Sequence, residues 1–541
     1  MRSHINIHRN LRIVAALAFF GTLTAVLVDF RQLVPQHPGH AIASLQFVPA
    51  AVALVTGALA TGVLALAVLL LTLLIGRAYC SVICPLGVFQ DVVMRLSKWL
   101  RPKARPLAFT ARRTLWRQVF LWGTLAGVAA GWAGFVLSLI DPYSNYGRIA
   151  SALFRPLLAL ANNAVVGSAN AVGIASLYRV NLPWPGIGAL VAPALFLTLI
   201  VIMSALRGRL YCNTVCPVGT ILGWVARHAA FRISIDKSAC TKCAACFRAC
   251  KAQCIDLRNS EVDFDRCVAC NNCISVCDER GINYRFMWRR DRKTATEPGM
   301  KLEDSGAKDP ERRALFGRTI AALTLASGFP RQSHAAQNKH RHGQPEIPAA
   351  ANDNVSVGVS PPGSGSVERF LDRCTACHLC ISACPSKVLQ PALFEYGLEG
   401  FMKPRLDFSA AYCAYDCVRC AEVCPDGAIA VLPVAQKQLQ QIGLATFHQE
   451  KCIVKTQGTD CAACSEHCPT KAVFTVPYGN NLRMPKVNQA LCVGCGACQY
   501  VCPATPEKAI TVAGVRVHSL AVREVEKPAA LPAKPASDFP F

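Results

Sequence analysis

The chain has 541 residues, 52% of them hydrophobic, and a formal net charge of +24. This composition excludes one ordinary soluble domain and predicts several domains, at least one of them in a membrane. It does not favour nucleic-acid binding, because the basic residues cluster beside apolar runs and no basic stripe is interleaved with stacking aromatics.

Residues 1–235 are expected to form a membrane α-helical domain with four transmembrane helices. Four apolar stretches are long enough to cross a hydrocarbon core, which takes about 20 helical residues; they are residues 11–28, 47–75, 118–140 and 186–206. The basic loop 76–117 is placed in the cytoplasm, together with the N-terminus, by the positive-inside rule. A fifth apolar stretch, 156–177, contains three asparagines that would each need a partner in lipid, so we expect it to be interfacial or re-entrant.

Two segments of this domain repeat one another, GRAYCSVICPLG from Gly76 and GRLYCNTVCPVG from Gly208. With two spans between them, both CxxxCP elements are expected on the cytoplasmic side at the same depth. They supply four thiols, the number that one iron–sulfur cubane or one zinc ion takes: Cys80, Cys84, Cys212 and Cys216. The alternative is that these cysteines are small residues in tight turns, redox-active without a metal.

Beyond residue 235 the cysteines recur in six quartets. Four quartets have the spacing CxxCxxCxxxC: Cys240, Cys243, Cys246, Cys250; Cys267, Cys270, Cys273, Cys277; Cys374, Cys377, Cys380, Cys384; and Cys492, Cys495, Cys498, Cys502. Two have a longer first gap: Cys413, Cys417, Cys420, Cys424; and Cys452, Cys461, Cys464, Cys468. Zinc is not favoured. Zinc sites usually join two CxxC halves, and a site of that kind would leave the third cysteine of each run unexplained. Cys254 is left over and is expected to pack beside a cluster without binding it.

The quartets predict six [4Fe-4S] clusters. In two-cluster ferredoxins the fourth cysteine of each run binds the neighbouring cluster. This rule gives six ligand sets: Cys240, Cys243, Cys246, Cys277 (set 1); Cys267, Cys270, Cys273, Cys250 (set 2); Cys374, Cys377, Cys380, Cys424 (set 3); Cys413, Cys417, Cys420, Cys384 (set 4); Cys452, Cys461, Cys464, Cys502 (set 5); and Cys492, Cys495, Cys498, Cys468 (set 6).

The paired quartets predict three α+β dicluster domains of the bacterial ferredoxin type, at residues 236–290, 369–430 and 445–515, followed by a tail at 516–541. A linker at 291–368 contains the segment 311–335, which begins with paired arginines and continues with a short apolar stretch and small residues. This pattern is typical of an export signal. Export would place 330–541 in the periplasm, with 236–290 in the cytoplasm. The alternative is a surface helix at 311–335, with everything after residue 207 in the cytoplasm.

These motifs resemble two ferredoxin-type proteins of periplasmic nitrate reductase systems joined end to end. Residues 1 to about 290 are similar to the polytopic NapH (MauN) type, which has paired CxxxCP elements and a dicluster tail. Residues 311–520 are similar to the NapG (MauM) type, which has a twin-arginine leader and four clusters. The resemblance implies transfer of electrons from quinol to a periplasmic redox protein, so the expected partners are the quinone pool of a bacterial inner membrane and such a protein.

The resulting hypothesis is an electron carrier that is a component of a quinol dehydrogenase system, with no catalytic residue and no quinone-binding residue assigned. Because the cytoplasmic pair of clusters and the exported four would be separated by a core of about 30 Å, a membrane quinone is expected to carry electrons between them. Two alternatives stay open. One is a maturation factor that supplies electrons to a partner metalloenzyme or reduces a metal ion, as in the CcoG type. The other is a wholly cytoplasmic ferredoxin relay.

Overall fold

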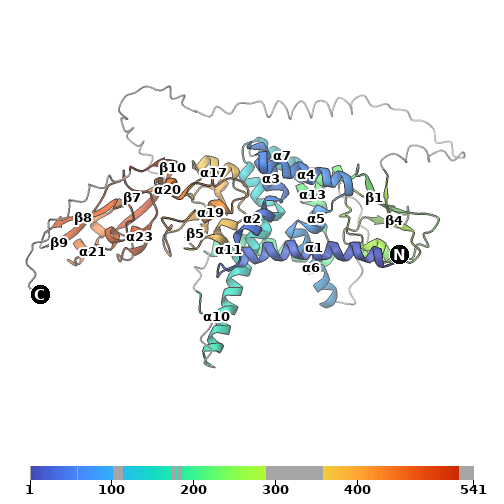
Figure 1. Ribbon diagram of the computed structural model, residues 1–541, viewed down its shortest axis with the longest axis horizontal. Coiled ribbons are helices and arrows are strands. Elements are labelled where there is room, and N and C mark those ends of the chain that lie inside the picture. The colour runs from blue at the N-terminus through green and yellow to red at the C-terminus, as the bar shows by residue number, and fades with distance from the viewer. Residues whose placement is uncertain are drawn as a thin grey trace, which may run out of the picture.

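The computed structural model describes residues 2–57, 59–100, 114–171, 178–180, 186–287, 358–479 and 481–522. The predicted export segment 311–335 lies outside the described residues. A helical domain occupies the middle of the molecule, and a cysteine-rich region lies at each end of it (Figure 1). Residues 231–287 form the region at one end, and residues 358–522 form the region at the other.

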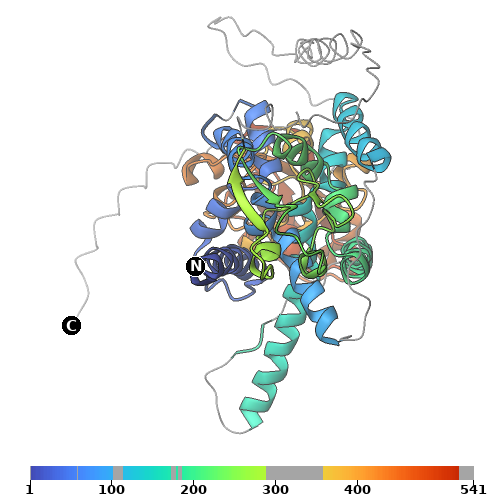
Figure 2. The same ribbon diagram turned by 90° about the vertical axis from the view of Figure 1, so that its right-hand side faces the viewer.

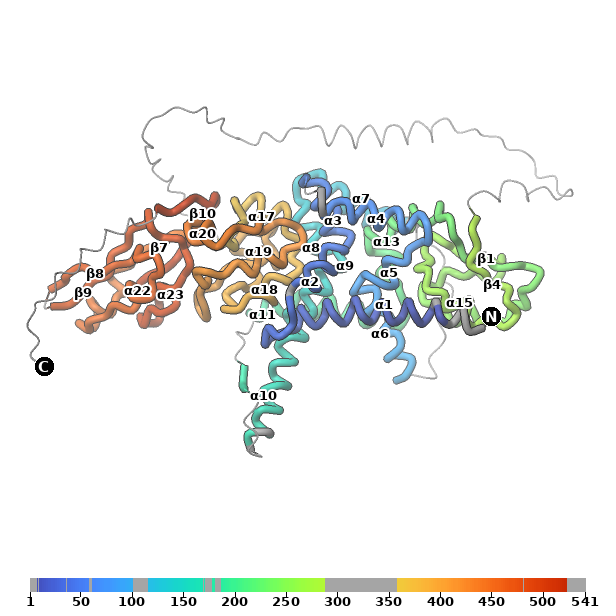
Figure 3. The backbone as a smooth tube through the Cα atoms, in the orientation of Figure 1, coloured from blue at the N-terminus to red at the C-terminus, as the bar shows by residue number. Residues whose placement is uncertain are grey.

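Helix α1 (Arg2–Val28) runs along the helical domain from one cysteine-rich region to the other (Figure 3). At 1.5 Å per residue, its 27 residues span about 40 Å. Near its start, Arg9 Nη1 donates to Ser275 Oγ at 3.1 Å, and near its end the carbonyl of Leu27 accepts from Ser382 Oγ at 2.7 Å. The helix therefore holds the two cysteine-rich regions on opposite sides of the helical domain.

The prediction of one spanning helix at 47–75 is wrong. The chain forms α3 (Phe47–Val55) and α4 (Leu59–Ile75), with Gly57 between them at φ +83°. This left-handed conformation favours glycine because it has no Cβ. The two helices fold back on each other so closely that a Cβ on Gly62 would lie 2.7 Å from the Cα of Leu54. Helix α3 also follows α2 (Gln36–Ser44) at a bend of 74°.

The prediction of one spanning helix at 118–140 is also wrong, because the chain again turns back at a glycine with positive φ. Helix α7 (Thr114–Ala129) ends before Gly131, which has φ +91°, and α8 (Ala133–Ile140) returns beside it. A Cβ on Gly127 would lie 2.6 Å from Val136 Cγ2, so the return depends on a small residue at the contact. Two apolar runs that looked like spans are thus helical hairpins.

The first part of the segment 156–177 continues a helix that begins before it. Helix α9 (Pro142–Ile149), a π-helical turn (Ala150–Phe154) and α10 (Arg155–Ala171) follow one another without a break, and α10 extends away from the rest of the molecule in Figure 2. Two of the three asparagines have partners: Arg31 donates to Asn162, and Asn163 exchanges two hydrogen bonds of 2.9 Å with the backbone of Val180.

Three helical segments among the described residues are long and apolar enough to cross a membrane: Arg9–Val28, Pro142–Ser168 and Ile187–Arg207, the last of these being α11. The bent pair α2 and α3 would make a fourth span if it crosses as one unit. The predicted spans at 11–28 and 186–206 therefore coincide with long apolar helices, and the other two do not.

The cysteine-rich regions are built from short helices and two-stranded antiparallel sheets. Strand β1 (Phe231–Ile235) pairs with β4 (Ile282–Phe286), and β2 (Ile255–Asp256) pairs with β3 (Glu261–Val262). At the other end the pairs are β5 (Leu389–Pro391) with β6 (Pro404–Leu406), β7 (Gln440–Phe447) with β10 (Ile510–Leu520), and β8 (Val473–Tyr478) with β9 (Leu482–Val487). The cysteines lie between these pairs, with the short helices α14 (Ala245–Ala249), α15 (Asn272–Ser275), α18 (Leu379–Ala383), α19 (Arg419–Glu422), α22 (Ala463–Glu466) and α23 (Ala497–Val501).

Candidate metal centres

The two CxxxCP elements have the same local structure. The first consists of α5 (Tyr79–Val82) and α6 (Pro85–Leu100), and the second of α12 (Leu210–Thr214) and α13 (Pro217–Ala226). In each, a proline opens the second helix, where its missing N–H and fixed φ cost nothing. The cysteine before that proline accepts a hydrogen bond from a glycine N–H in the first turn, which for Cys216 is the N–H of Gly219 at 3.3 Å.

The structure brings the four CxxxCP cysteines together, although one sequence could not show that the two loops converge. Cys84 lies close enough to Cys80, Cys212 and Cys216 to interact with all three electrostatically. All four side chains are buried. A single group of four thiols, taken from two loops more than a hundred residues apart in sequence, therefore lies inside the helical domain.

The other residues shared by the repeats have structural roles at this site. Gly76 and Gly208 open the repeats with φ +79° and +65°, which favours glycine. The closing glycines lie against the loop of their own element: a Cβ on Gly87 would lie 2.3 Å from the carbonyl oxygen of Cys80, and one on Gly219 would lie 2.2 Å from that of Cys212. The repeated residues thus set the shape of the two loops around the thiols.

Two buried arginines cross between the CxxxCP elements. Arg77 Nη2 donates to the carbonyl of Cys212 at 3.2 Å and lies 3.9 Å from the Sγ atom of Cys80. Arg209 Nη1 donates to the carbonyl of Cys80 at 2.6 Å. These side chains are 0% and 1% exposed. Positive charge beside thiols favours their thiolate forms, so this arrangement suits an anionic group such as a cubane with four thiolate ligands.

Carboxylates join the arginines to the domain that carries set 2. Asp91 accepts from Arg209 at 2.8 Å and from Lys251, which follows Cys250, at 2.7 Å. Asp265 precedes Cys267 by two residues; its side chain pairs with Arg117 at 2.8 Å, and its carbonyl accepts from Arg77 at 3.1 Å. Apart from the repeated Gly-Arg pair, no motif in the sequence marks these charged residues.

Each predicted cluster set also comes together, with its fourth cysteine contributed by the neighbouring run. In every set one thiol lies within electrostatic range of the other three: Cys246 in set 1, Cys273 in set 2, Cys380 in set 3, Cys420 in set 4, Cys464 in set 5 and Cys498 in set 6. The cysteines of set 1 line one cavity of 140 Å³, and those of set 5 line another. The arrangement therefore matches the crossed pairing and not four consecutive cysteines.

The four strict CxxCxxCxxxC loops share an unusual backbone. The residues on both sides of the second cysteine have positive φ: Lys242 and Ala244, Ala269 and Asn271, Ala376 and His378, and Gly494 and Gly496. Left-handed residues that interrupt right-handed backbone point successive N–H groups into one concave surface, and such surfaces bind anions, including iron–sulfur clusters. The loops thus offer backbone donors as well as thiols.

The number of thiols in each set suits a cubane. Within the part of the chain that the structure describes, no group of three or more His, Cys, Asp or Glu side chains is placed to hold one metal ion. Four ligands of one zinc ion must converge at Zn–S distances of about 2.3 Å, whereas a cubane presents four separate iron corners. The cysteine sets are accordingly of the right kind and number for [4Fe-4S] clusters.

Cys254, the leftover cysteine, lies beside set 2. Its Sγ atom is 3.5 Å from that of Cys250, and the side chain is buried. The hydrogen bond from Cys254 is the main cause that lowers the pKa of the Cys250 thiol, which favours the thiolate that a metal needs. Cys254 thus supports a predicted ligand.

The sets lie in an order that differs from their order in the sequence. Set 1 adjoins set 2 through Cys246 and Cys273, and set 3 adjoins set 4 through Cys380 and Cys420. Next to set 4 comes set 6, because the N–H of Cys413 donates to the carbonyl of Cys495 at 3.0 Å. Set 5 follows through Cys464, which lies near Cys498. The row in the C-terminal region therefore reads 3, 4, 6, 5.

Set 3 is attached directly to the helical domain. A Cβ on Gly147 of α9 would lie 2.1 Å from the carbonyl oxygen of Cys377, so only glycine permits this approach. Ser151 Oγ lies 2.9 Å from Nδ1 of the buried His378, whose Nε2 lies 2.8 Å from the carbonyl of Met402. Arg155 donates to the carbonyls of Ile381 and Ser382.

Comparison with known proteins supports the same chemistry. Family models described as 4Fe-4S binding domains match residues 58–104, 189–236 and 485–504, and one described as a 4Fe-4S dicluster domain matches 373–429. The ferredoxin-type protein NapF of Escherichia coli strain K12 is 32% identical over 165 residues, which are 30% of this chain and 90% of NapF. No solved structure matches the chain.

Two further relatives are the methylamine utilization ferredoxin-type proteins MauN and MauM of Methylorubrum extorquens. MauN is 29% identical over 38% of this chain and 55% of its own length, and MauM is 28% identical over 36% of this chain and 86% of its own length. The fold and the cysteine sets define an iron–sulfur electron-transfer protein with helices of membrane-spanning length. The chain belongs to the family of ferredoxin-type proteins that includes NapF, and the predicted resemblance to the MauN and MauM types is confirmed.

Proposed function

We propose that this protein is a membrane-bound electron carrier between the quinone pool and a redox protein, and that its six cluster sets and its CxxxCP site form one row. The main support for this proposal is that the CxxxCP site has contacts toward set 2 on one side and toward set 3 on the other. Asn213, next to Cys212, donates to the carbonyl of Ala252 beside set 2 at 3.2 Å, and Tyr211, the residue before Cys212, donates to the carbonyl of Ile140 at 2.8 Å. Ile140 directly precedes the Asp141 cap of α9, the helix that contacts set 3.

In this proposal each of the six sets holds one [4Fe-4S] cluster, and Cys80, Cys84, Cys212 and Cys216 hold a seventh centre. When bound, such clusters supply one-electron oxidation and reduction. Arg77 and Arg209 place positive charge beside the four thiols and, being buried, keep water away from them. In this proposal a fixed site, in place of a diffusing quinone, links the two halves.

The arrangement supports opposite sides of the membrane for the two cysteine-rich regions. They lie at the two ends of α1, whose length of about 40 Å exceeds the hydrocarbon core of about 30 Å. The end of α1 beside residues 231–287 carries Arg9 and Arg12, which favours the cytoplasm for that end. Residues 358–522 would then be periplasmic. Cys243 of set 1 is exposed, so a soluble partner has access to the cytoplasmic end of the row.

Iron analysis tests the seventh centre. The full-length protein is reconstituted anaerobically, and iron and labile sulfide are counted in the wild type, in the Cys84→Ser/Cys216→Ser variant and in a Thr214→Ser control from α12. We expect the double variant to lose about four iron atoms per chain and the control to lose none. Equal iron in all three proteins would show that the CxxxCP thiols hold no cluster.

Quinol oxidation tests the link to the membrane. Inverted membrane vesicles that contain the protein are treated with a quinol, and reduction of the clusters is followed by absorbance. We expect reduction with the wild type and a large loss with Cys84→Ser/Cys216→Ser. No quinol-dependent reduction in the wild type would reject the quinone partner. Protease added to spheroplasts should cleave residues 358–522, and protection of this region would support the cytoplasmic relay instead.

A further inference from the structure

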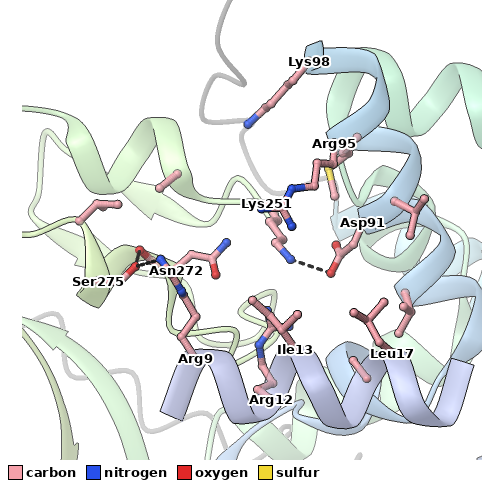
Figure 4. Close-up of a pocket in the computed structure, with 16 residues that line it drawn as sticks. Arg9, Arg12, Ile13, Leu17, Asp91, Arg95, Lys98, Lys251, Asn272 and Ser275 are labelled. Carbon is pink, nitrogen blue, oxygen red and sulfur yellow. Dashed lines mark hydrogen bonds and ion pairs between the residues drawn. The ribbon is translucent and has the colours of Figure 1, made fainter. Parts of the chain in front are cut away.

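A cavity of 370 Å³ lies between α1, α6 and the loops around set 2 (Figure 4). Its polar lining is strongly basic: Arg9, Arg12, Arg95, Lys98 and Lys251. Asp91 is the only carboxylate among the described residues that line it, and it is engaged by Arg209 and Lys251. The cavity therefore has an excess of positive charge, which suits an anionic ligand.

The donors at the inner wall are incompletely used. Arg9 donates to Ser275 at 3.1 Å, and Arg12 donates to the carbonyl of Ser81 at 3.4 Å. The Nε atoms of both arginines are buried and have no hydrogen-bond partner among the described residues. Guanidinium groups with free N–H donors bind phosphate oxygens in a fork geometry. Both side chains line the cavity and each still has an unsatisfied donor.

The other wall of the cavity is apolar and continues onto the outside of the helical domain. Ile13 and Leu17 come from α1, and Val88 and Val92 come from α6. Leu17 is 53% exposed and belongs to the candidate span Arg9–Val28. A ligand that fills the cavity and follows this wall would be anionic at one end and apolar at the other.

We propose that this cavity binds the phosphate headgroup of an anionic phospholipid, with an acyl chain along α1 and α6. Basic pockets between helices at the cytoplasmic side of a membrane have the chemistry that such headgroups require. A quinol fits less well, because the described lining offers no histidine and no unengaged carboxylate to take its protons. The headgroup would offset the repulsion among the cations and hold the 231–287 domain, through Lys251 and Ser275, against the helical domain. The proposal goes beyond the electron-transfer function and does not depend on it.

A binding titration on the full-length protein in detergent tests the lipid site. The probes are dihexanoyl phosphatidylglycerol, dihexanoyl phosphatidylcholine and inorganic phosphate. The variants are Arg9→Gln/Arg12→Gln and the more exposed pair Arg95→Gln/Lys98→Gln. The control is Arg207→Gln/Arg258→Gln, which removes the same charge from two exposed residues that do not line the cavity.

We expect the wild type to bind phosphatidylglycerol more tightly than either other probe. Each cation near a membrane surface contributes roughly fivefold in affinity, so each double variant should bind roughly 25-fold more weakly, whereas the control stays within about twofold. If Arg9→Gln/Arg12→Gln fails to fold, judged by its iron content, the exposed pair still decides the outcome. Equal binding of the two lipids, or of inorganic phosphate, would overturn the proposal. So would displacement of phosphatidylglycerol by a short-chain quinone at equal concentration, which would mark the cavity as a quinone site.

Discussion

Arg77 and Arg209 cross over between the two repeats: Arg77 donates to the carbonyl of Cys212, and Arg209 donates to the carbonyl of Cys80. Each repeat thus carries the arginine that supports the loop of the other. These crossed hydrogen bonds hold the two loops, and with them the four thiols, in one buried site. Asp91, which contacts both Arg209 and Lys251, links that site to the domain that holds set 2.

Removal of the Arg209 guanidinium should weaken the junction between these two domains. The Arg209→Met variant leaves Asp91 with only Lys251, and loss of one partner from a buried ion pair costs about 3 kcal/mol. We expect a lower thermal unfolding temperature and faster hydrogen exchange in residues 250–275. The Arg207→Met variant, at the exposed end of α11, should leave both unchanged. An unchanged exchange rate in Arg209→Met would mean that the pair does not hold the junction.

The closing glycines of the repeats should not tolerate a methyl group. In Gly87→Ala and Gly219→Ala the new Cβ would meet the carbonyl oxygens of Cys80 and Cys212 at 2.3 and 2.2 Å. The forced shift of these loops should cost about 1–3 kcal/mol and lower the iron bound at the CxxxCP site. Gly123→Ala in α7 is the control, because nothing lies within 4 Å of its Cβ. Normal iron content and stability in all three variants would contradict the close approach.

Double variants can distinguish crossed from consecutive cluster ligands. Two substitutions within one set should remove only one cluster, so Cys240→Ser/Cys277→Ser should lose about as much iron as Cys277→Ser alone. Cys267→Ser/Cys277→Ser should lose about twice as much, because these residues belong to sets 1 and 2. The reverse result, with the larger loss in Cys240→Ser/Cys277→Ser, would indicate four consecutive ligands.

The contact between α9 and set 3 should depend on Gly147. In Gly147→Ala a Cβ would lie 2.1 Å from the carbonyl oxygen of Cys377, so the C-terminal region should separate from the helical domain while its cysteine sets stay complete. We expect unchanged iron content, faster hydrogen exchange in residues 147–155 and slower quinol-dependent reduction. Gly167→Ala, in the same long helix, meets only Arg179 at 3.7 Å and should behave as the wild type. Slow exchange in Gly147→Ala would show that the junction tolerates the methyl group.

The cysteine chemistry could be derived from the sequence alone. Spacings such as that from Cys374 to Cys384 determine which thiols a short loop can present, and the rule for two-cluster ferredoxins predicts that the neighbouring run supplies the fourth ligand. The repeat from Gly76 and Gly208 likewise marked the four CxxxCP thiols, since matching residues adopt matching loops. Helices at 11–28 and 186–206 followed from long uninterrupted apolar runs.

The tertiary structure alone decided the path of the helical domain and the order of the sites. Gly57 and Gly131 turn two apolar runs into hairpins, and hydropathy does not register this because one glycine barely changes the mean of a window. The convergence of Cys84 with Cys216, the burial of Arg77 and Arg209, and the place of set 6 beside set 4 all depend on contacts between residues far apart in the chain. Such contacts arise from the packing of whole elements, which a local pattern of residues does not encode.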